Sequence, residues 1–373
     1  MIKIVAVSSK KELAAFIDFP HDLHNGDSNY VPELHIAQKD LLSKHPFFEH
    51  SSLQCFLAYN DNNKIVGRIA AILNNNHNKF NQANDGFFGF FDCVNDQKVA
   101  NLLFDSAVKW LKEKGANKLV GPTNPSTNET CGLLVKGFDS PPVVMMPYNP
   151  EYYISLFENY GLHKQVDLLA WSWKGQNYND KSLQLLDKLK DRLQRNSNIV
   201  IRKINLKNFK EEANKLREVY NHAWDKNMGF FPMTDNEFDY VAKDLKLILD
   251  PDFAYVAEQD GKIVGFGVAI PDINQILRTI KKGRLFPTGI FKLLFNKKKV
   301  RGIRIMLLGV IEGYRKLGIE ACLYGTIIKE YRRKDYDYAE ASWTLEHNDM
   351  VNKAIEAIGG DPYKTYRIYE KEI

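Results

Sequence analysis

The chain has 373 residues, of which 44% are hydrophobic and 12% aromatic, and its formal net charge is +5. This length exceeds that of most single domains, so two domains are expected, and the apolar content excludes an intrinsically disordered protein. No apolar run approaches the length that crosses a bilayer, and the first residues lack the layout of a signal peptide, so we expect a cytoplasmic protein.

The cysteines and histidines predict no metal site. The four cysteines stand singly in or beside apolar stretches, without a CxxC pair, and the nine histidines form no HExxH group. We therefore expect buried free thiols and neither a structural nor a catalytic zinc. The cysteines are Cys55, Cys93, Cys131 and Cys322.

The first half begins with a predicted β-hairpin at residues 56–72, where two apolar runs flank an Asn/Asp turn and the sequence KIVG. A strand-like run at 86–94 leads into an amphipathic helix at 99–115, followed by the strand-like sequence NKLVGPT. A second amphipathic helix follows Asn149, which can cap or precede it, and ends at Gly161.

Between these elements lies an irregular segment, residues 121–153, rich in Pro, Asn, Ser and Thr. Proline restricts the backbone and Asn or Ser can hydrogen-bond it locally, so we expect an ordered loop. It is either a well-packed connection or a substrate contact, and the two interpretations carry equal weight. Its polar candidates for a substrate contact are Asn124, Asn128, Glu129 and Tyr148.

The second half repeats the plan of the first. A hairpin at 254–270 again contains KIVG and ends in Ala-Ile, and it is followed by the strand RIMLLGV, a helix after Gly318 and the strand YAEASW. A helix then begins near Asn348 and ends at Gly359. We therefore predict two domains of one plan, residues 1–175 and 195–373, joined by a polar linker.

Two further segments of the second half could contact partners. Residues 218–238 combine aromatic and amide side chains, which are more often core than binding site, but they include the acceptor-pocket candidates Asn221, Trp224 and Phe231. Residues 273–304 form a basic insertion with ten Lys or Arg, no Asp or Glu, and an apolar cluster at 290–295. Three uses compete for it: a lid over an anionic cofactor, a surface for anionic lipid or an acyl carrier, and a solvated basic face. Nucleic acid is a weaker partner, because no recognition motif accompanies the charge.

The most informative stretch is 307–325, LLGVIEGYRKLGIEACLYG, which predicts a strand, a glycine-bearing turn and a helix. The first N–H groups of such a helix lack partners inside the helix, and the helix dipole adds partial positive charge there. An ordinary strand–helix connection shares this pattern, but an anion, above all a phosphate, is the ligand that it favours.

These residues resemble the signature of the GNAT acyltransferase superfamily: Arg or Gln, two residues, Gly, one residue, then Gly or Ala. Arg315, Gly318 and Ile319 match it, whereas Glu320 stands where Gly or Ala is expected and Ala321 follows. The resemblance implies two tandem GNAT-like domains of the α/β (α+β) class, each with a mixed, mostly antiparallel sheet flanked by helices. It also implies that acetyl-CoA or another acyl-CoA binds in the second half, at Leu308, Gly309, Val310, Arg315, Leu317, Gly318, Ile319, Glu320, Ala321 and Asn348.

The first half departs from the signature. At residues 94–101 it has VNDQKVAN, with no glycine and no matching arginine, so its turn is less able to admit a pyrophosphate. We expect a degenerate copy that shapes the substrate side or stabilises the pair.

An amine acceptor must lose a proton during acyl transfer, so a base near the cofactor is required. Glu340 and Glu346, on and after the strand that ends in SWTLE, are the carboxylate candidates. Many GNAT enzymes use a tyrosine of the last helix as the acid. Here that position holds Ile355, which leaves the role vacant or moves it to Tyr363, Tyr366 or Tyr369 in the following strands, and of these Tyr366 is our candidate.

The sequence thus predicts an N-acyltransferase, most simply an N-acetyltransferase, that acts on a small-molecule or peptide amine. A non-catalytic GNAT-fold ligand-binding or scaffold protein is the alternative, supported by Glu320 and the missing helix tyrosine. Transfer of a long acyl or aminoacyl group is a third possibility, in which the basic insertion contacts lipid or a carrier.

Overall fold

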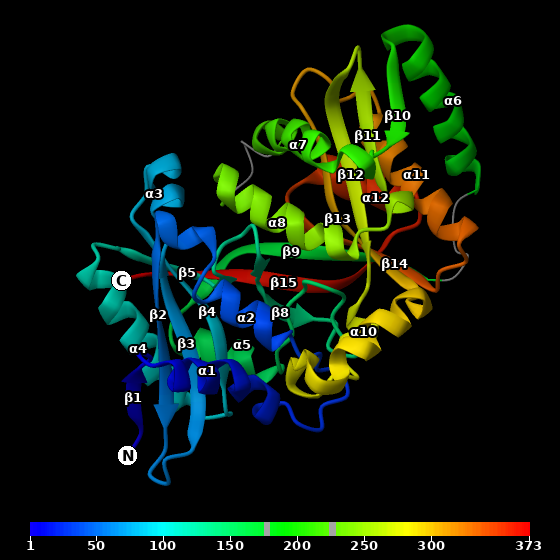
Figure 1. The fold of residues 1–373 in the computed structure, drawn as a ribbon. Coiled ribbons are helices and arrows are strands. Elements are labelled where there is room, and N and C mark those ends of the chain that lie inside the picture. The colour runs from blue at the N-terminus through cyan, green and yellow to red at the C-terminus, as the bar shows by residue number, and fades with distance from the viewer. Residues whose placement is uncertain (175–179, 224–228) are drawn as a thin grey trace. The chain divides into compact units, whose positions relative to one another are not determined.

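The computed structural model describes residues 1–174, 180–223 and 229–373, and the chain forms two compact units (Figure 1). The first unit contains Met1–Leu168, Asn274–Lys298 and Lys364–Ile373, and the second contains Leu169–Ile273 and Lys299–Tyr363. These units differ from the two contiguous predicted domains. Most of the basic insertion and most of the C-terminal strand belong to the first unit, although they lie in the second half of the sequence. Sequence order alone cannot show such an exchange of segments.

In the sheet of the first unit β4 and β5 run parallel, whereas the pairs β1–β2, β2–β3, β3–β4 and β5–β15 are antiparallel. The last strand of the chain, β15, lies next to β5 in this sheet and also pairs with β8. In spatial order the strands are β1 (Lys3–Ala6), β2 (Ser52–Tyr59), β3 (Ile65–Leu73), β4 (Asp85–Cys93), β5 (Lys118–Gly121) and β15 (Asp361–Glu372), with β8 (Leu133–Lys136) beside β15.

Alternation along the strands assigns the two faces of this sheet. Ile69 and Ala71 of β3 share one core with the helix α4, whereas Arg68, which directly precedes Ile69, donates to the carbonyl of Phe16 in α1. The helices α4 and α1 therefore cover opposite faces. The helices of this unit are α1 (Lys10–Leu23), α2 (His35–Leu41), α3 (Asn75–Asn81), α4 (Gln97–Glu113) and α5 (Tyr152–Asn159), and the insertion adds α9 (Asn274–Leu277) and α10 (Ile290–Asn296).

The second unit repeats this sheet. Here β13 and β14 run parallel, and β10 to β13 follow one another in antiparallel order. Beside β14 lies β9, which precedes the second half of the chain in sequence. In spatial order the strands are β9 (His163–Lys174), β14 (Tyr338–Leu345), β13 (Gly302–Val310), β12 (Lys262–Pro271), β11 (Ala254–Gln259) and β10 (Ile199–Lys203).

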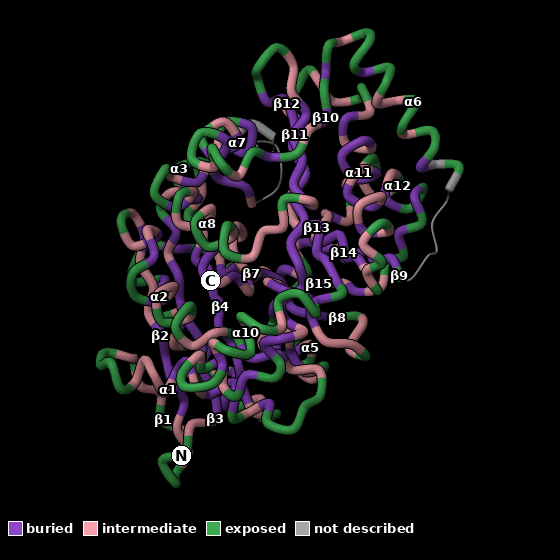
Figure 2. Tube along the Cα trace, turned by 45° about the vertical axis from the view of Figure 1, so that its right-hand side comes forward, coloured by how far each residue is buried: buried purple, intermediate pink, exposed green. Residues whose placement is uncertain are grey.

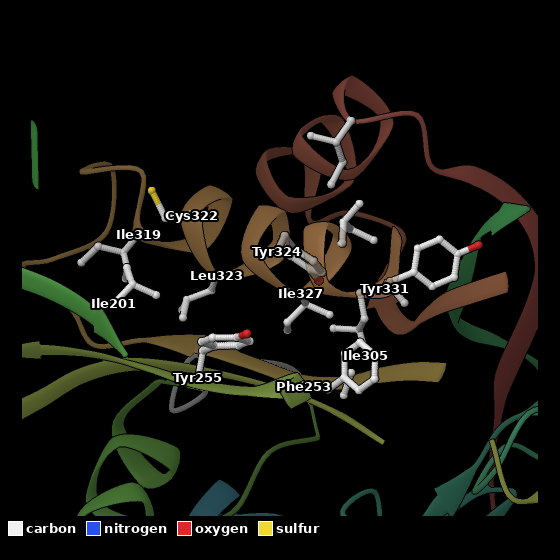
Figure 3. Close-up of a cluster of buried hydrophobic side chains, with 14 of the residues drawn as sticks. Ile201, Phe253, Tyr255, Ile305, Ile319, Cys322, Leu323, Tyr324, Ile327 and Tyr331 are labelled. Atoms are coloured by element: carbon white, nitrogen blue, oxygen red, sulfur yellow. The ribbon is translucent and has the colours of Figure 1, made fainter. Parts of the chain in front are cut away.

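The helix α11 covers one face of the second sheet. Figure 3 shows its side chains pointing toward Tyr255 and Ile305 of the strands. On β10, Ile201 belongs to the same buried cluster as α11. The next residue, Arg202, points to the other face and pairs with Glu212 of α7, so α7 lies on the face opposite α11. Figure 2 shows the same division, with buried strands beneath helices that expose their outer sides. The helices are α6 (Asp180–Ser197), α7 (Phe209–Ala223), α8 (Asp235–Ile248), α11 (Ile319–Arg333) and α12 (Asp349–Ala357).

Local sequence signals account for several of these elements. The two KIVG segments form the β2–β3 and β11–β12 hairpins. Ser9 with Glu12 and Thr234 with Glu237 form capping boxes that begin α1 and α8. The predicted mixed, mostly antiparallel sheets flanked by helices are confirmed. The four cysteines are buried and free, as expected, and none of the helices in the described ranges has the length and apolar content that crossing a membrane requires.

Candidate functional site

The two units can be aligned residue by residue through their strand registers. Gly67 pairs with Cys93 in the first unit, and Gly265, in the same KIVG context, pairs with Val310 in the second. By this register β4 corresponds to β13 and α4 to α11. The strand–turn–helix of each unit can therefore be compared at equivalent positions.

In the second unit the parallel strands separate part-way along β13. Their pairing ends at Ile305 with Ala341, although β13 continues to Val310 and β14 to Leu345. A register shift against β12 falls at the same place, between Val268 and Ala269. Beyond it, residues 306–308 of β13 are only half-buried. The strand end that contains the predicted residues Leu308, Gly309 and Val310 thus lies at an opening in the sheet.

The helix that follows, α11, begins without a side-chain cap. Its N-cap is Gly318, in the left-handed conformation with φ of 88°, and no side chain caps the first turn from that position. Leu317 is exposed and Ala321 is half-buried, whereas the side chain of Ile319 is fully buried under the helix. Backbone N–H groups at this end therefore remain candidates for binding an anion.

Two side chains hold the turn between β13 and α11. Arg315 donates from Nε to the carbonyl oxygen of Val310 at 3.1 Å, and the Tyr314 hydroxyl donates to Oε1 of Gln259 at 2.5 Å. Arg315 thus links the strand end to the turn. Its guanidinium group places a fixed positive charge beside the start of α11.

Glu320 is half-buried in the first turn of α11. Burial raises its pKa above the ordinary value, and a hydrogen bond from its own backbone N–H and the charge of Arg315 offset only part of this rise. The carboxylate is therefore easier to neutralise than an exposed one. Its conflict with a bound phosphate is smaller than the sequence alone suggests.

Gly318 also has a packing role that the sequence did not reveal. A Cβ atom at this position would lie 2.6 Å from Cδ2 of Leu189 in α6, and one at Gly325 would lie 2.0 Å from Cδ1 of Leu186. Both glycines therefore allow α6 to approach α11 closely. A substitution at Gly318 has to be judged for folding as well as for ligand binding.

The predicted residues after β14 take different positions. Asn348 is the N-cap of α12 and its side chain accepts from the backbone N–H of Val351 at 3.4 Å. Glu346 is half-buried just before it, and its carbonyl accepts from Asn352. Both residues follow β14 in the chain, as the sequence predicted, and their roles in binding and catalysis stay predictions.

Glu340 lies in a buried polar network instead. Its carboxylate accepts hydrogen bonds from the hydroxyl groups of Ser342 and Tyr363, and Arg304 donates to the Ser342 hydroxyl at 2.9 Å. The side chain is 1% exposed, and burial raises its pKa although these hydrogen bonds and the Arg304 charge act in the opposite direction. Such a carboxylate orients its neighbours, and the catalytic role predicted for it stays a prediction.

The residues predicted to bind the acceptor differ in their surroundings and do not form one exposed cluster among the described residues. Phe231 is 1% exposed and belongs to the core. Asn221 is in α7, and its Oδ1 is buried without a hydrogen-bond donor among the described residues. Trp224 lies outside the described residues. Tyr366, the predicted acid, is buried in the part of β15 that belongs to the first unit.

The equivalent opening in the first unit is filled by the chain itself. Pairing of β4 with β5 ends at Phe87 with Val120, and β4 is buried beyond that point. The segment 123–124 runs directly against the strand: a Cβ atom at Gly89 would lie 1.7 Å from the Thr123 carbonyl oxygen, and Asn124 Oδ1 accepts from the Phe90 N–H at 2.6 Å. Asn124, a predicted substrate contact, thus satisfies the backbone of β4.

The helix start in the first unit is closed as well. Asp96 caps α4 by accepting from the Lys98 N–H at 2.8 Å, so a carboxylate occupies the position where an anion would bind. Asn149 does not cap α5, because its side chain bonds both backbone groups of Leu134. These contacts give a physical basis for the expected degeneracy of the first half.

The comparisons with known proteins agree with this architecture. No family model matches the chain. The chain is 38% identical to "Protein YghO" of Escherichia coli over 98% of its own length and 94% of that protein. It is 34% identical to "Bacterial ceramide synthase" of Caulobacter vibrioides over 100% of its length and 98% of that protein. The chain belongs to the family of these two proteins.

Solved structures show the fold of this family member. A tandem GNAT protein from the clavulanic acid biosynthesis pathway matches it with a TM-score of 0.58 at 11% identity, covering 100% of this chain and 98% of the other. A GCN5-related N-acetyltransferase from Sphaerobacter thermophilus matches with a TM-score of 0.52 at 10% identity, covering 99% and 95%. The fold is therefore that of the tandem GNAT proteins, as the turn at Gly318 predicted.

The first unit also contains a polar cluster that the sequence analysis missed. Asp92, equivalent by register to Gly309, accepts from Arg68 at 2.8 Å and contacts Nε2 of His24 at 3.1 Å, and the Tyr153 hydroxyl donates to it at 3.3 Å. Burial alone would raise the pKa of Asp92, but Arg68 and His24 outweigh this effect and hold it below the ordinary value. The sequence did hold a signal for this cluster: Arg68 and Asp92, of opposite charge, each interrupt an otherwise apolar strand.

The predicted loop residue Tyr148 lies beside this cluster. Its hydroxyl donates to Asp27, and its ring stands edge-on to that of His24 with centroids 5.7 Å apart. The neighbouring His21 contacts the Tyr30 hydroxyl through Nδ1 at 2.8 Å, and burial lowers its pKa to about 4. His21 is therefore neutral and buried at ordinary pH, and both His21 and His24 pack against tyrosine rings in this unit.

Proposed function

We propose that this chain is an acyl-CoA-dependent N-acyltransferase and that its second unit binds the acyl-CoA. One observation carries the proposal: β13 is half-buried at residues 306–308, where it leaves β14, and it leads into a helix whose N-cap residue, Gly318, has no side chain to cap the first turn. In the first unit the same positions are filled by residues 123–124 and by Asp96. One site per chain is therefore expected.

The residues of the second unit would act mainly by binding and orienting. Backbone N–H groups from Leu317 to Ala321 would hold the pyrophosphate, with Arg315 supplying charge beside it. Backbone groups of β13 near Val310 would orient the thioester and polarise its carbonyl. The amine nitrogen attacks this carbonyl, the carbon–sulfur bond breaks, and CoA leaves as a thiolate, which takes up a proton as the amine gives one up. Glu346 is our candidate for the base that takes the amine proton, because Glu340 already accepts two hydroxyl hydrogen bonds.

For the acceptor, we propose the amino group of a long-chain amino alcohol, and for the donor a long-chain acyl-CoA. The support is the 34% identity, over the whole chain, to the protein named bacterial ceramide synthase, since a ceramide is the amide of such an amino alcohol with a fatty acid. This proposal replaces acetyl transfer to a small amine as our preferred reaction. We further propose a cytoplasmic site of action, where acyl-CoA is available.

Titration calorimetry and product analysis with the full chain test this function. We expect CoA and palmitoyl-CoA to bind at one site per chain, and palmitoyl-CoA with sphinganine to give N-acylsphinganine and free CoA by mass spectrometry. Absence of CoA binding at millimolar concentration would overturn the site. Binding without any amide product from a panel of amines would support the second candidate, a GNAT-fold protein that binds ligand without catalysis. The acidic Glu320 in the helix turn is the observation that favours that candidate.

A further inference from the structure

One segment of the first unit has a surface that packing of the core does not explain. We name residues 281–298 the docking segment. In it Phe286, Phe291, Leu294 and Phe295 are 76%, 56%, 65% and 76% exposed. Other large apolar side chains of comparable exposure in the described chain are scattered singly, so this concentration within ten residues is specific to the segment.

The helix α10 presents these side chains together. Phe291, Leu294 and Phe295 are spaced i, i+3 and i+4, which places them on one face of the helix. The rings of Phe291 and Phe295 are stacked with centroids 6.3 Å apart, and α10 has no buried residue. An apolar helix face therefore points to solvent.

Positive charge surrounds this face. Arg284 makes a bidentate pair with Asp18, at 2.9 and 2.6 Å, and Lys282 pairs with Asp22 at 2.7 Å, so these two cations attach the segment to α1. In the described parts of the chain no carboxylate pairs with three further lysines of the segment, Lys281, Lys292 and Lys298. The segment itself contains no acidic residue.

The segment also borders an open hollow of about 340 Å³. The cationic side chains Lys281, Lys282, Arg284 and Lys292 line it together with Phe286. Such a hollow combines positive charge with an aromatic wall, which suits a phosphate group attached to an apolar tail.

The segment is held in a defined conformation. Gly283 has a φ of 61°, and a Cβ atom there would lie 1.8 Å from the Glu33 carbonyl oxygen. Nearby, Asn274 donates to the Pro142 carbonyl at 2.9 Å. The exposed rings are thus fixed on a folded support, and their exposure is a property of the fold.

We propose that the docking segment binds the surface of a bilayer that contains anionic phospholipid, with the exposed rings in the headgroup layer and the lysines at the phosphates. A protein partner would have to bury the lysines that border the rings, and lysine is depleted in protein interfaces. At a bilayer the same ammonium groups stay hydrated. The inference rests on the proposed function in one respect: a long-chain amino alcohol acceptor would lie in the bilayer to which the docking segment binds.

Vesicle co-sedimentation of the full chain tests the docking. We expect binding to phosphatidylcholine vesicles with about one third phosphatidylglycerol, and at least about tenfold weaker binding to phosphatidylcholine alone. The triple variant Phe286→Ser, Phe291→Ser, Phe295→Ser should lose at least about tenfold in affinity. The control variant Leu185→Ser, Leu247→Ser changes two similarly exposed side chains, 61% and 71%, on other helices and should bind like wild type.

Charge is tested separately with Lys281→Gln, Lys298→Gln, which should weaken binding roughly fivefold per lysine and reduce its salt dependence. The matched control Lys98→Gln, Lys109→Gln changes two exposed lysines of α4 and should have no effect. Equal binding by the triple variant and wild type overturns the proposal, as does binding of an acyl carrier protein without binding of vesicles.

Transfer to a water-soluble short-chain amino alcohol, without vesicles, separates this proposal from the proposed function. The triple variant should keep this activity. Transfer without any vesicle binding leaves the acyltransferase function standing and rejects the docking. Vesicle binding that depends on the rings, without transfer to any amine, supports the docking and rejects the acyltransferase function.

Discussion

The two strand–turn–helix segments of this chain share one plan but differ in what occupies the turn. In the second unit residues 306–308 of β13 are half-buried just beyond the end of its pairing with β14, and α11 starts at a left-handed glycine. In the first unit the chain fills the same opening, and Asp96 caps α4. Duplication therefore preserved the sheet, whereas a few contacts decide which copy can accept an anionic ligand.

Position 309 and its equivalent show how small this difference is. In the second unit the register pair is Phe266 with Gly309, two uncharged residues. In the first it is Arg68 with Asp92, which is buried and also contacts His24. A glycine leaves the strand end open, whereas a buried ion pair ties it to α1.

The largest expected effect comes from breaking that ion pair. Arg68→Met leaves the buried Asp92 carboxylate without its cation, and the free energy of unfolding should fall by about 3–5 kcal/mol. Urea unfolding followed by circular dichroism measures this change. The control Arg301→Met removes an exposed arginine that pairs with Asp335 and Asp337 and should cost no more than about 1 kcal/mol. Equal losses in the two variants would contradict the structural role of the cluster.

The same pair should leave a signature at acid pH. The pKa of Asp92 is lower in the folded than in the unfolded chain, so its stabilisation is complete above the unfolded pKa and is lost as the pH falls toward the folded one. Asp92→Asn should therefore flatten the decline of the unfolding free energy between about pH 5 and pH 3. Denaturant titrations across this range check it, and an unchanged slope would argue against a charged Asp92.

Giving the open helix start an acidic cap should convert the second unit to the closed type. Gly318→Asp places a carboxylate where Asp96 stands in the first unit, and CoA affinity should fall by about 100-fold or more, as measured by calorimetry. Gly261→Asp is the matched control, since Gly261 is also left-handed, with φ of 81°, but has open space around it. Because Leu189 lies near Gly318, Leu189→Ala is combined with Gly318→Asp, and circular dichroism confirms folding. Retained CoA binding in a folded variant would contradict this site.

Removing the acidic cap of the first unit should change stability but not binding. Asp96→Ala loses the hydrogen bond to the Lys98 N–H, so the free energy of unfolding should fall by about 1 kcal/mol. CoA stoichiometry should remain one per chain, since residues 123–124 still fill the opening. A second CoA in calorimetry would show that the cap alone had closed this unit.

Glu320→Gln should give the smallest effect. Glu320 has a raised pKa, so lowering the pH neutralises it, and CoA should bind the wild type more tightly at pH 5.5 than at pH 8. The variant should bind a few-fold more tightly at pH 8 and lose most of this pH dependence. Calorimetry measures the CoA affinity of both proteins at the two pH values. If wild type and variant show the same pH dependence, Glu320 does not lie near the bound phosphate.

Local sequence signals were sufficient for much of the fold. The repeated KIVG hairpins, the apolar strand before Gly318 and the Asn348 helix cap were found where the residues predicted them, because turns, caps and alternation depend on near neighbours. The resemblance of the turn to the GNAT signature gave the fold family. Glu346 and Asn348 lie after β14 for the same local reason.

Contacts between distant residues could not be predicted in this way. The exchange of β15 into the first sheet, and the attachment of the insertion to α1 through Arg284 and Asp18, join residues more than 200 positions apart. The close packing of Gly318 on Leu189 was hidden for the same reason, since a glycine in a turn already has a local explanation. Glu340 was ranked by its place on a strand, and only the structure showed its partners Ser342 and Tyr363.

The sequence by itself determined the duplicated plan and the helix start that lacks an acidic cap, since both depend on residues that are neighbours in the chain. The tertiary structure decided which opening is filled, where the buried charges pair and which apolar side chains remain exposed. These properties depend on the space and the partners around a residue, and tertiary packing alone supplies both.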